Sequence, residues 1–149
     1  MTENELSRVI VDSAFKIHTT LGPGLLESVY EAVLAHELKL RGCHVDVQQA
    51  IPVVYEGEQL PIGFRADLVV DHKVVIEVKS VDAVTPVFAK QLRTYLRLMD
   101  KRLGLLINFN VNLIKDGITR VVNNLSEGDF PQSRRDAKSR LRENELDSG

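Results

Sequence analysis

Apolar and polar positions divide the first part of the chain into two helices. Apolar side chains recur at helical spacing within residues 4–20 and again within residues 25–41, so we predict an amphipathic helix over each range. A Leu-Gly-Pro-Gly segment at residues 21–24 separates the two helices, and Gly42 ends the second one. We expect the first helix to be a packing element.

Strand-like runs come next. Residues 44–55 are rich in valine and isoleucine, and Pro52 favours an edge strand or a bulge there. After a turn at residues 56–58, two further strands are predicted over residues 60–70 and 74–80. The middle of the chain is therefore expected to form consecutive antiparallel strands.

The remaining elements alternate between helix and strand. Thr85 and Pro86 are typical of a helix start, with the threonine hydroxyl as the cap, and this helix should run to about Met99. The continuous apolar run at 103–109 predicts a strand covered on both sides, and residues 113–123 suggest a hairpin that turns at an Asp-Gly pair.

The hairpin over residues 64–80 concentrates the candidate chemistry. If its turn is centred on His72, Asp67 lies across from Glu77, and Lys79 and Arg65 project to the same side. The opposite face is then wholly apolar, because it carries Leu68, Val70, Val74, Ile76 and Val78.

Facing carboxylates indicate a metal site. Asp67 and Glu77 would resist ionising together unless a cation lies between them, and oxygen ligands suit Mg²⁺ or Mn²⁺. The ammonium of Lys79 could then orient an attacking water, which suggests metal-assisted phosphodiester hydrolysis. The alternative is a solvated salt-bridge face, since a single Glu-x-Lys is common on exposed strands.

Other polar residues have two interpretations each. Glu27 heads an apolar line on its helix, so it is either a first-turn acid left in water or an acid pressed toward a metal or a base. Gln91 and Tyr95 lie one turn apart at the border of their helix's core side and could hold a phosphate or a nucleotide. A basic row on that helix is either a solvated face or a track for a nucleic-acid backbone. The four histidines are scattered along the sequence, which favours structural or surface roles.

Composition limits the remaining possibilities. A length of 149 residues fits one domain, which we place at residues 1–124, followed by a charged tail at 125–149 that should be a frayed helix or disordered. The net charge of −2 requires any phosphate binding to come from a local patch. One cysteine excludes an internal disulfide. With no membrane-spanning run and no signal-peptide pattern, we expect a cytoplasmic protein.

Several motifs together resemble a known enzyme family. The segment Gly-Leu-Leu-Glu-Ser-Val-Tyr at residues 24–30 resembles the signature of the GxxExxY protein family, which belongs to the PD-(D/E)XK nuclease superfamily. Asp67 matches the metal-binding aspartate of that superfamily, and Glu77 with Lys79 matches its E-x-K pair. Gln91 and Tyr95 resemble the Gln-x-x-x-Tyr motif of the RecB-like branch. The resemblance covers roughly residues 21–122, and Ala66 replaces the proline of the PD motif.

The resemblance implies a fold, a cofactor and a set of roles. The fold would be α/β, with a restriction-endonuclease-like core in which helices flank a mixed central sheet in αβββαβ order, plus an added N-terminal helix. The activity would be a Mg²⁺- or Mn²⁺-dependent nuclease, with DNA favoured over RNA. The implied metal ligands are Asp67, Glu77, the Val78 carbonyl and Glu27. Lys79 would act on the attacking water, and the implied substrate-binding residues are Gln91, Tyr95 and Arg65.

Two other hypotheses about the function of the chain remain open. The chain could be a catalytically idle adaptor that keeps the nuclease fold and binds nucleic acid or protein. It could also be an obligate homodimer whose apolar strand at 103–109 pairs between two copies.

Overall fold

The structure is a computed structural model that describes residues 1–125, apart from the side chain of Ile62. The predicted tail beyond Leu125 lies outside the described residues. Helices α1 (Glu3–Leu21) and α2 (Glu27–Leu40) come first, and both match the predicted ranges closely. The remaining elements are β1 (Val45–Tyr55), β2 (Glu58–Val70), β3 (Val74–Lys79), α3 (Pro86–Met99), β4 (Leu103–Asn108), a 3₁₀ turn η1 (Ile114–Gly117) and β5 (Ile118–Val122).

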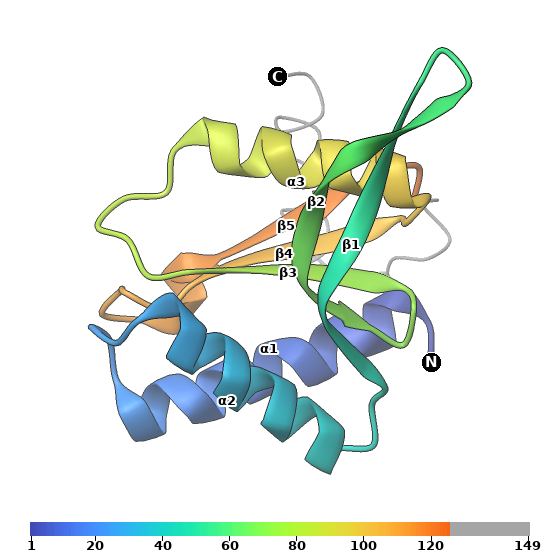
Figure 1. Cartoon of the computed structure of the whole chain (residues 1–149). Helices are drawn as coiled ribbons and strands as arrows, with labels where there is room; N and C mark the ends of the chain where they lie inside the picture. Colours follow the sequence, from blue (N-terminus) through green and yellow to red (C-terminus); the bar gives the residue numbers. More distant parts are fainter. Residues whose placement is uncertain (126–149) are drawn as a thin grey trace.

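One mixed sheet organises these elements. Its strand order is β1-β2-β3-β4-β5, and every neighbouring pair is antiparallel except β3 and β4, which α3 connects as a parallel crossover. Figure 1 shows α1 and α2 on one face of the sheet and α3 on the other. This arrangement confirms the predicted α/β fold with a mixed sheet, the αβββαβ order and an added N-terminal helix. Among the described helices, none is long and apolar enough to cross a membrane.

The central hairpin has the predicted register. Leu68 pairs with Ile76 and Val70 with Val74, as expected for a turn centred on His72. Asp71 and His72 both adopt positive φ, at 50° and 57°, a conformation that aspartate and histidine tolerate better than most residues. The Asp71 carboxylate also accepts a hydrogen bond of 2.8 Å from the backbone N–H of His44, which holds the turn against the start of β1.

Two apolar cores lie on the two faces of the sheet. The face predicted to be apolar packs on α1 and α2, and all five of its predicted residues are buried there. The opposite face carries Val69 and Val75 in addition to the predicted polar residues, and α3 covers these two valines. The hairpin's polar residues are therefore confined to the end of that face that lies far from the turn.

The edges of the sheet confirm one prediction and overturn two. β1 is an edge strand, and its pairing with β2 shifts at Pro52, beyond which the β1–β2 hairpin projects from the body (Figure 1).

The predicted hairpin at 113–123 is wrong, because its first arm is η1 and β5 pairs with β4 instead. Gly117 explains this, since a Cβ there would lie 2.1 Å from the Asn108 carbonyl oxygen, so the turn packs directly on β4. β4 is hydrogen-bonded to β3 and β5 on its two sides, which leaves it no edge for pairing with a second copy.

Candidate active site

The candidate site forms where β2 separates from β3. The hydrogen-bonded pairing of β2 with β3 ends at Leu68 and Ile76. One residue further, the Asp67 carboxylate rather than a backbone carbonyl accepts the N–H of Val78, at 2.8 Å, and the N–H of Asp67 points to a Glu77 carboxylate oxygen at 3.4 Å. The predicted juxtaposition of Asp67 and Glu77 is therefore present, at the point where the two strands diverge.

Glu77 is the most strongly perturbed acid among the described residues. Its side chain is nearly buried, with 8% of the residue exposed. Burial, then the negative charge of Asp67 and a hydrogen bond to that carboxyl group, raise the pKa of Glu77 to about 9, although the charge of Lys79 acts in the opposite direction. At neutral pH the buried carboxyl group of Glu77 therefore either keeps its proton or ionises beside a cation that offsets its charge.

Two groups next to Glu77 face the same region. In a strand the N–H and C=O of one residue point to the same side, so the carbonyl of Val78 is directed, like its N–H, toward the gap left by β2. Lys79 is half-buried, and its Nζ lies 4.6 Å from the centre of the Phe88 ring on α3. Its ammonium is thus held on the α3 side of the acid pair by a cation–π contact.

Glu27 joins the first turn of α2 to the end of β3. One of its carboxylate oxygens accepts the N–H of Ser80 at 3.3 Å, and the Ser80 hydroxyl donates to the Leu25 carbonyl at 2.6 Å. Glu27 is exposed, so it remains in contact with water while it is held beside the strand that carries Glu77 and Lys79. Glu27 therefore has features of both alternatives, since it is a first-turn acid in contact with water and its carboxylate is also held at the end of β3.

The tyrosine three residues after Glu27 fixes the loop that precedes α2. The Tyr30 hydroxyl donates to the Gly22 carbonyl and accepts the N–H of Leu25 at 3.2 Å. Its ring is fully buried and stacks on Phe109, with ring centres 4.5 Å apart. Tyr30 therefore connects the loop to Phe109, the residue directly after β4. This contact is a structural reason for the Gly-x-x-Glu-x-x-Tyr spacing.

Tyr30→Phe is expected to lower the free energy of unfolding by about 1–2 kcal/mol, because the ring stays packed while the two hydrogen bonds of its buried hydroxyl are lost. Urea denaturation measures this change. Tyr55→Phe is the matched control, since Tyr55 is exposed at the tip of the β1–β2 hairpin and its substitution should leave the midpoint unchanged. Equal midpoints for Tyr30→Phe and the wild type would contradict the role assigned to the hydroxyl.

Sequence reasoning missed two residues of the site. The Gln48 side-chain amide donates to Glu31 at 2.7 Å and to Asp67 at 3.2 Å, so it bridges α2 and β2. Gln48 has a positive φ of 53°, a strained conformation that often marks functional positions. Burial raises the pKa of Glu31, and the charges of Asp67 and Glu27 add to this effect, while the hydrogen bond from Gln48 opposes it. The position of Glu31 one helical turn after Glu27 was the available signal.

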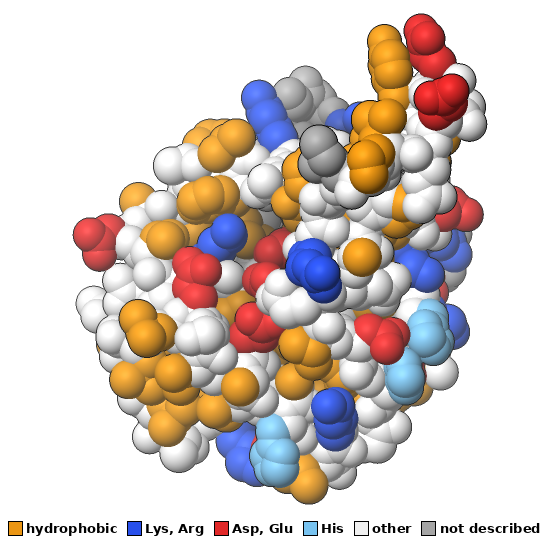
Figure 2. Space-filling view, in the orientation of Figure 1, with side chains coloured by type: hydrophobic (Ala, Val, Ile, Leu, Met, Phe, Trp, Pro, Cys, Tyr) orange, Lys and Arg blue, Asp and Glu red, His pale blue; other side chains and the backbone are white. Residues whose placement is uncertain are grey.

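These side chains line an open cleft of about 700 Å³. On the face shown in Figure 2, acidic side chains gather near the centre, between α2 and the diverging strands. Glu77 and Lys79 are not among the lining residues. The cleft is lined by Gly24, Leu25, Leu26, Glu27, Ser28, Glu31, Gln48, Asp67, Ser80 and Asn110.

The three predicted substrate-binding residues have different environments. Arg65 is exposed, and its guanidinium donates to the Gln48 carbonyl at 3.2 Å, beside the cleft. Gln91 is exposed on α3. Tyr95 does not reach outward as expected, because only 7% of it is exposed, it belongs to the core under α3, and its ring is in contact with the exposed Phe64. Burial raises the pKa of Tyr95, and the charges of Glu77 and Asp67 raise it further.

The sequence of this chain matches the model of one protein family. The family model of the PD-(D/E)XK nuclease superfamily matches residues 4–121, which span every described element from α1 to β5. No curated protein sequence and no solved structure matches the chain significantly. Nucleases of this superfamily generally use divalent metals, and the acid pair fits that requirement. The sheet, the diverging hairpin and the matched residues lead to one conclusion: the chain belongs to the PD-(D/E)XK nuclease superfamily.

Proposed function

We propose that this protein is an active Mg²⁺- or Mn²⁺-dependent nuclease that hydrolyses phosphodiester bonds, with DNA favoured over RNA. The observation that carries the proposal is the Asp67–Glu77 pair, in which burial and mutual repulsion keep the pKa of Glu77 near 9. A structural salt bridge would instead pair each acid with a base. Two acids placed against each other at the edge of a cleft are an arrangement that a divalent cation stabilises.

A finer family assignment is part of the proposal. Gly24 has a positive φ of 98°, Glu27 is held beside β3, and Tyr30 secures the loop between them. These three positions support membership of the GxxExxY family. Gln91 and Tyr95 at their four-residue spacing on α3 support the RecB-like branch, with Tyr95 acting from the core near the acids rather than on the nucleotide.

Each residue of the site has a proposed role. Asp67, Glu77 and the Val78 carbonyl would hold the metal, and Glu27 would complete or orient its shell. A bound divalent ion supplies Lewis-acid stabilisation of the phosphate and a more acidic water. Lys79, placed by Phe88, would orient the attacking water and offset negative charge that develops on the phosphoryl oxygens. Arg65, whose guanidinium donates to the Gln48 carbonyl beside the cleft, would bind a neighbouring phosphate.

The proposal is tested by incubating single-stranded DNA, double-stranded DNA and RNA with the full chain in Mg²⁺ or Mn²⁺, and in chelator. Metal-dependent products are expected, and Lys79→Ala should lower the cleavage rate by about 10²-fold or more, because a positioned charge near the reacting phosphate is lost. Lys39→Ala is the matched control, since Lys39 is an exposed lysine in the last turn of α2.

Cleavage that persists in chelator, or that Lys79→Ala retains in full, would contradict the proposal. Nucleic-acid binding without products in either metal would favour the adaptor instead, and the comparison across substrates shows which nucleic acid it binds.

A further inference from the structure

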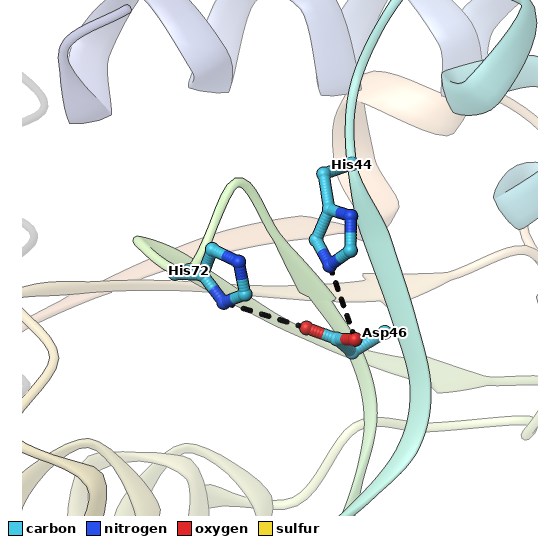
Figure 3. A group of neighbouring side chains, drawn as sticks. All are labelled: His44, Asp46 and His72. Atoms are coloured by element: carbon cyan, nitrogen blue, oxygen red, sulfur yellow. Dashed lines mark hydrogen bonds and ion pairs between the residues drawn. The ribbon is translucent and has the colours of Figure 1, made fainter.

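A second group of metal-ligand side chains lies at the opposite end of the central hairpin. His44 directly precedes β1, Asp46 is its second residue, and His72 is the centre of the β2–β3 turn. The histidines looked scattered in the sequence, but the structure brings two of them together, with stacked rings 4.6 Å apart. In Figure 3 both rings direct a nitrogen at the Asp46 carboxylate between them. Both histidines are exposed, as a surface role requires, but their proximity could not be inferred from their scatter along the sequence.

The distances match a transition-metal site. His44 Nε2 lies 3.2 Å from one carboxylate oxygen of Asp46, and His72 Nδ1 lies 3.5 Å from the other. One ligand atom from each residue falls within 4.8 Å of the other two. Ligands about 2.0 Å from a tetrahedral zinc ion are separated by about 3.3 Å, so a small closing movement of the two rings would complete three coordination positions.

The backbone holds this cluster in place without help from a metal. His44 and Asp71 exchange two hydrogen bonds, from His44 N–H to the Asp71 carboxylate and from Asp71 N–H to the His44 carbonyl, both of 2.8 Å. The positive φ of His72 directs the turn back over the start of β1. Pre-organised ligands lose less conformational entropy on binding, which favours affinity.

The cluster is separate from the acid site and differs from it chemically. His72 lies five residues along the hairpin from both Asp67 and Glu77, and the paired segments 68–70 and 74–76 separate it from them. Imidazole nitrogens select Zn²⁺, Cu²⁺ or Ni²⁺, whereas carboxylate and carbonyl oxygens select Mg²⁺ or Mn²⁺.

We propose that His44, Asp46 and His72 form a second metal site that binds one zinc-class transition ion, with water completing its shell. The ion would fasten the β2–β3 turn to the start of β1. Because the same hairpin carries Asp67 and Glu77 at its other end, the site would stabilise the strands that hold the nuclease centre. The site does not depend on the nuclease proposal.

The test is isothermal titration calorimetry of the full chain with Zn²⁺ in the presence of excess Mg²⁺, using an Asp67→Asn background so that the acid site contributes little. One Zn²⁺ per chain is expected. His72→Ala and His44→Ala should each weaken Zn²⁺ binding by about tenfold or more, because each removes a proposed metal ligand. Even the loss of a residue that only orients a ligand costs about tenfold in metal affinity. His36→Ala is the matched control, because His36 is an exposed histidine on α2, and its affinity should be unchanged.

Two further readouts distinguish a real site from a general histidine effect. In the Asp67→Asn background, excess Zn²⁺ should raise the melting temperature by about 5 °C, and Mg²⁺ should not reproduce that shift. Imidazole ¹⁵N spectra should show Zn²⁺ at Nε2 of His44 and at Nδ1 of His72. Equal Zn²⁺ affinity in the wild type, His44→Ala and His72→Ala, or no binding at all, would overturn the proposal.

Discussion

Asp67→Asn is expected to reduce metal-dependent cleavage by about 10³-fold while the chain stays folded. The substitution removes the negative charge that the metal requires, and several kcal/mol of transition-state stabilisation correspond to a rate loss of this size. Asparagine keeps an oxygen that can accept the Val78 N–H, so the contact that closes the β2–β3 divergence survives. Single-turnover cleavage in Mn²⁺, with circular dichroism on the same sample, measures both effects.

The matched control is Asp12→Asn, since Asp12 is an exposed aspartate of α1. That variant should cleave like the wild type. If Asp67→Asn retained wild-type cleavage, the metal would have to be held elsewhere, and the acid pair would be no more than a buried structural feature.

Glu77→Gln should make the metal-free protein more stable, by an amount that grows with pH. The pKa of Glu77 is about 9 in the native state against 4.5 for the usual side chain, so between these values the native state binds a proton that the unfolded chain has released. The wild type therefore loses stability as pH rises through that interval, at about 1.4 kcal/mol per pH unit. Glutamine resembles the protonated acid and removes this loss. Urea denaturation in chelator at pH 5 and pH 8 should show a gain of a few kcal/mol at the higher pH only.

Excess Mg²⁺ should abolish the same pH dependence in the wild type, because a bound cation favours the ionised carboxylate. Glu58→Gln, at an exposed position of β2, is the control and should change stability at neither pH. A wild-type protein whose stability in chelator was constant from pH 5 to pH 8 would show that Glu77 does not hold a proton there.

The local patterns of the sequence predicted most of the fold correctly. The apolar periodicity of α1 and α2 and the run at β4 fixed their type, since burial of an apolar stripe or a two-sided strand leaves few other solutions. The register of the central hairpin followed from its three polar turn residues. Because side chains alternate along strands, that register alone was enough to bring Asp67 opposite Glu77.

Where the predictions failed, contacts between distant segments decided the outcome. Tyr95 looked like a border residue on a helical wheel, but Phe64 of the projecting β1–β2 hairpin packs against it. The final hairpin was wrong because the close approach of Gly117 to β4 favours pairing with that strand over a local turn. The Thr85 hydroxyl, expected to cap α3, makes no capping hydrogen bond in the described structure.

The sequence by itself determined the elements up to β4, the hairpin register and the acid pair, because each depends on spacings within a single segment. The tertiary structure decided which distant groups complete them. Gln48 reaches Glu31 and Asp67 only because β1 pairs with β2 beneath α2, and the His44–His72 pair exists only because the hairpin turn folds over the start of β1. Such contacts depend on how the elements pack, and no spacing along the chain specifies them.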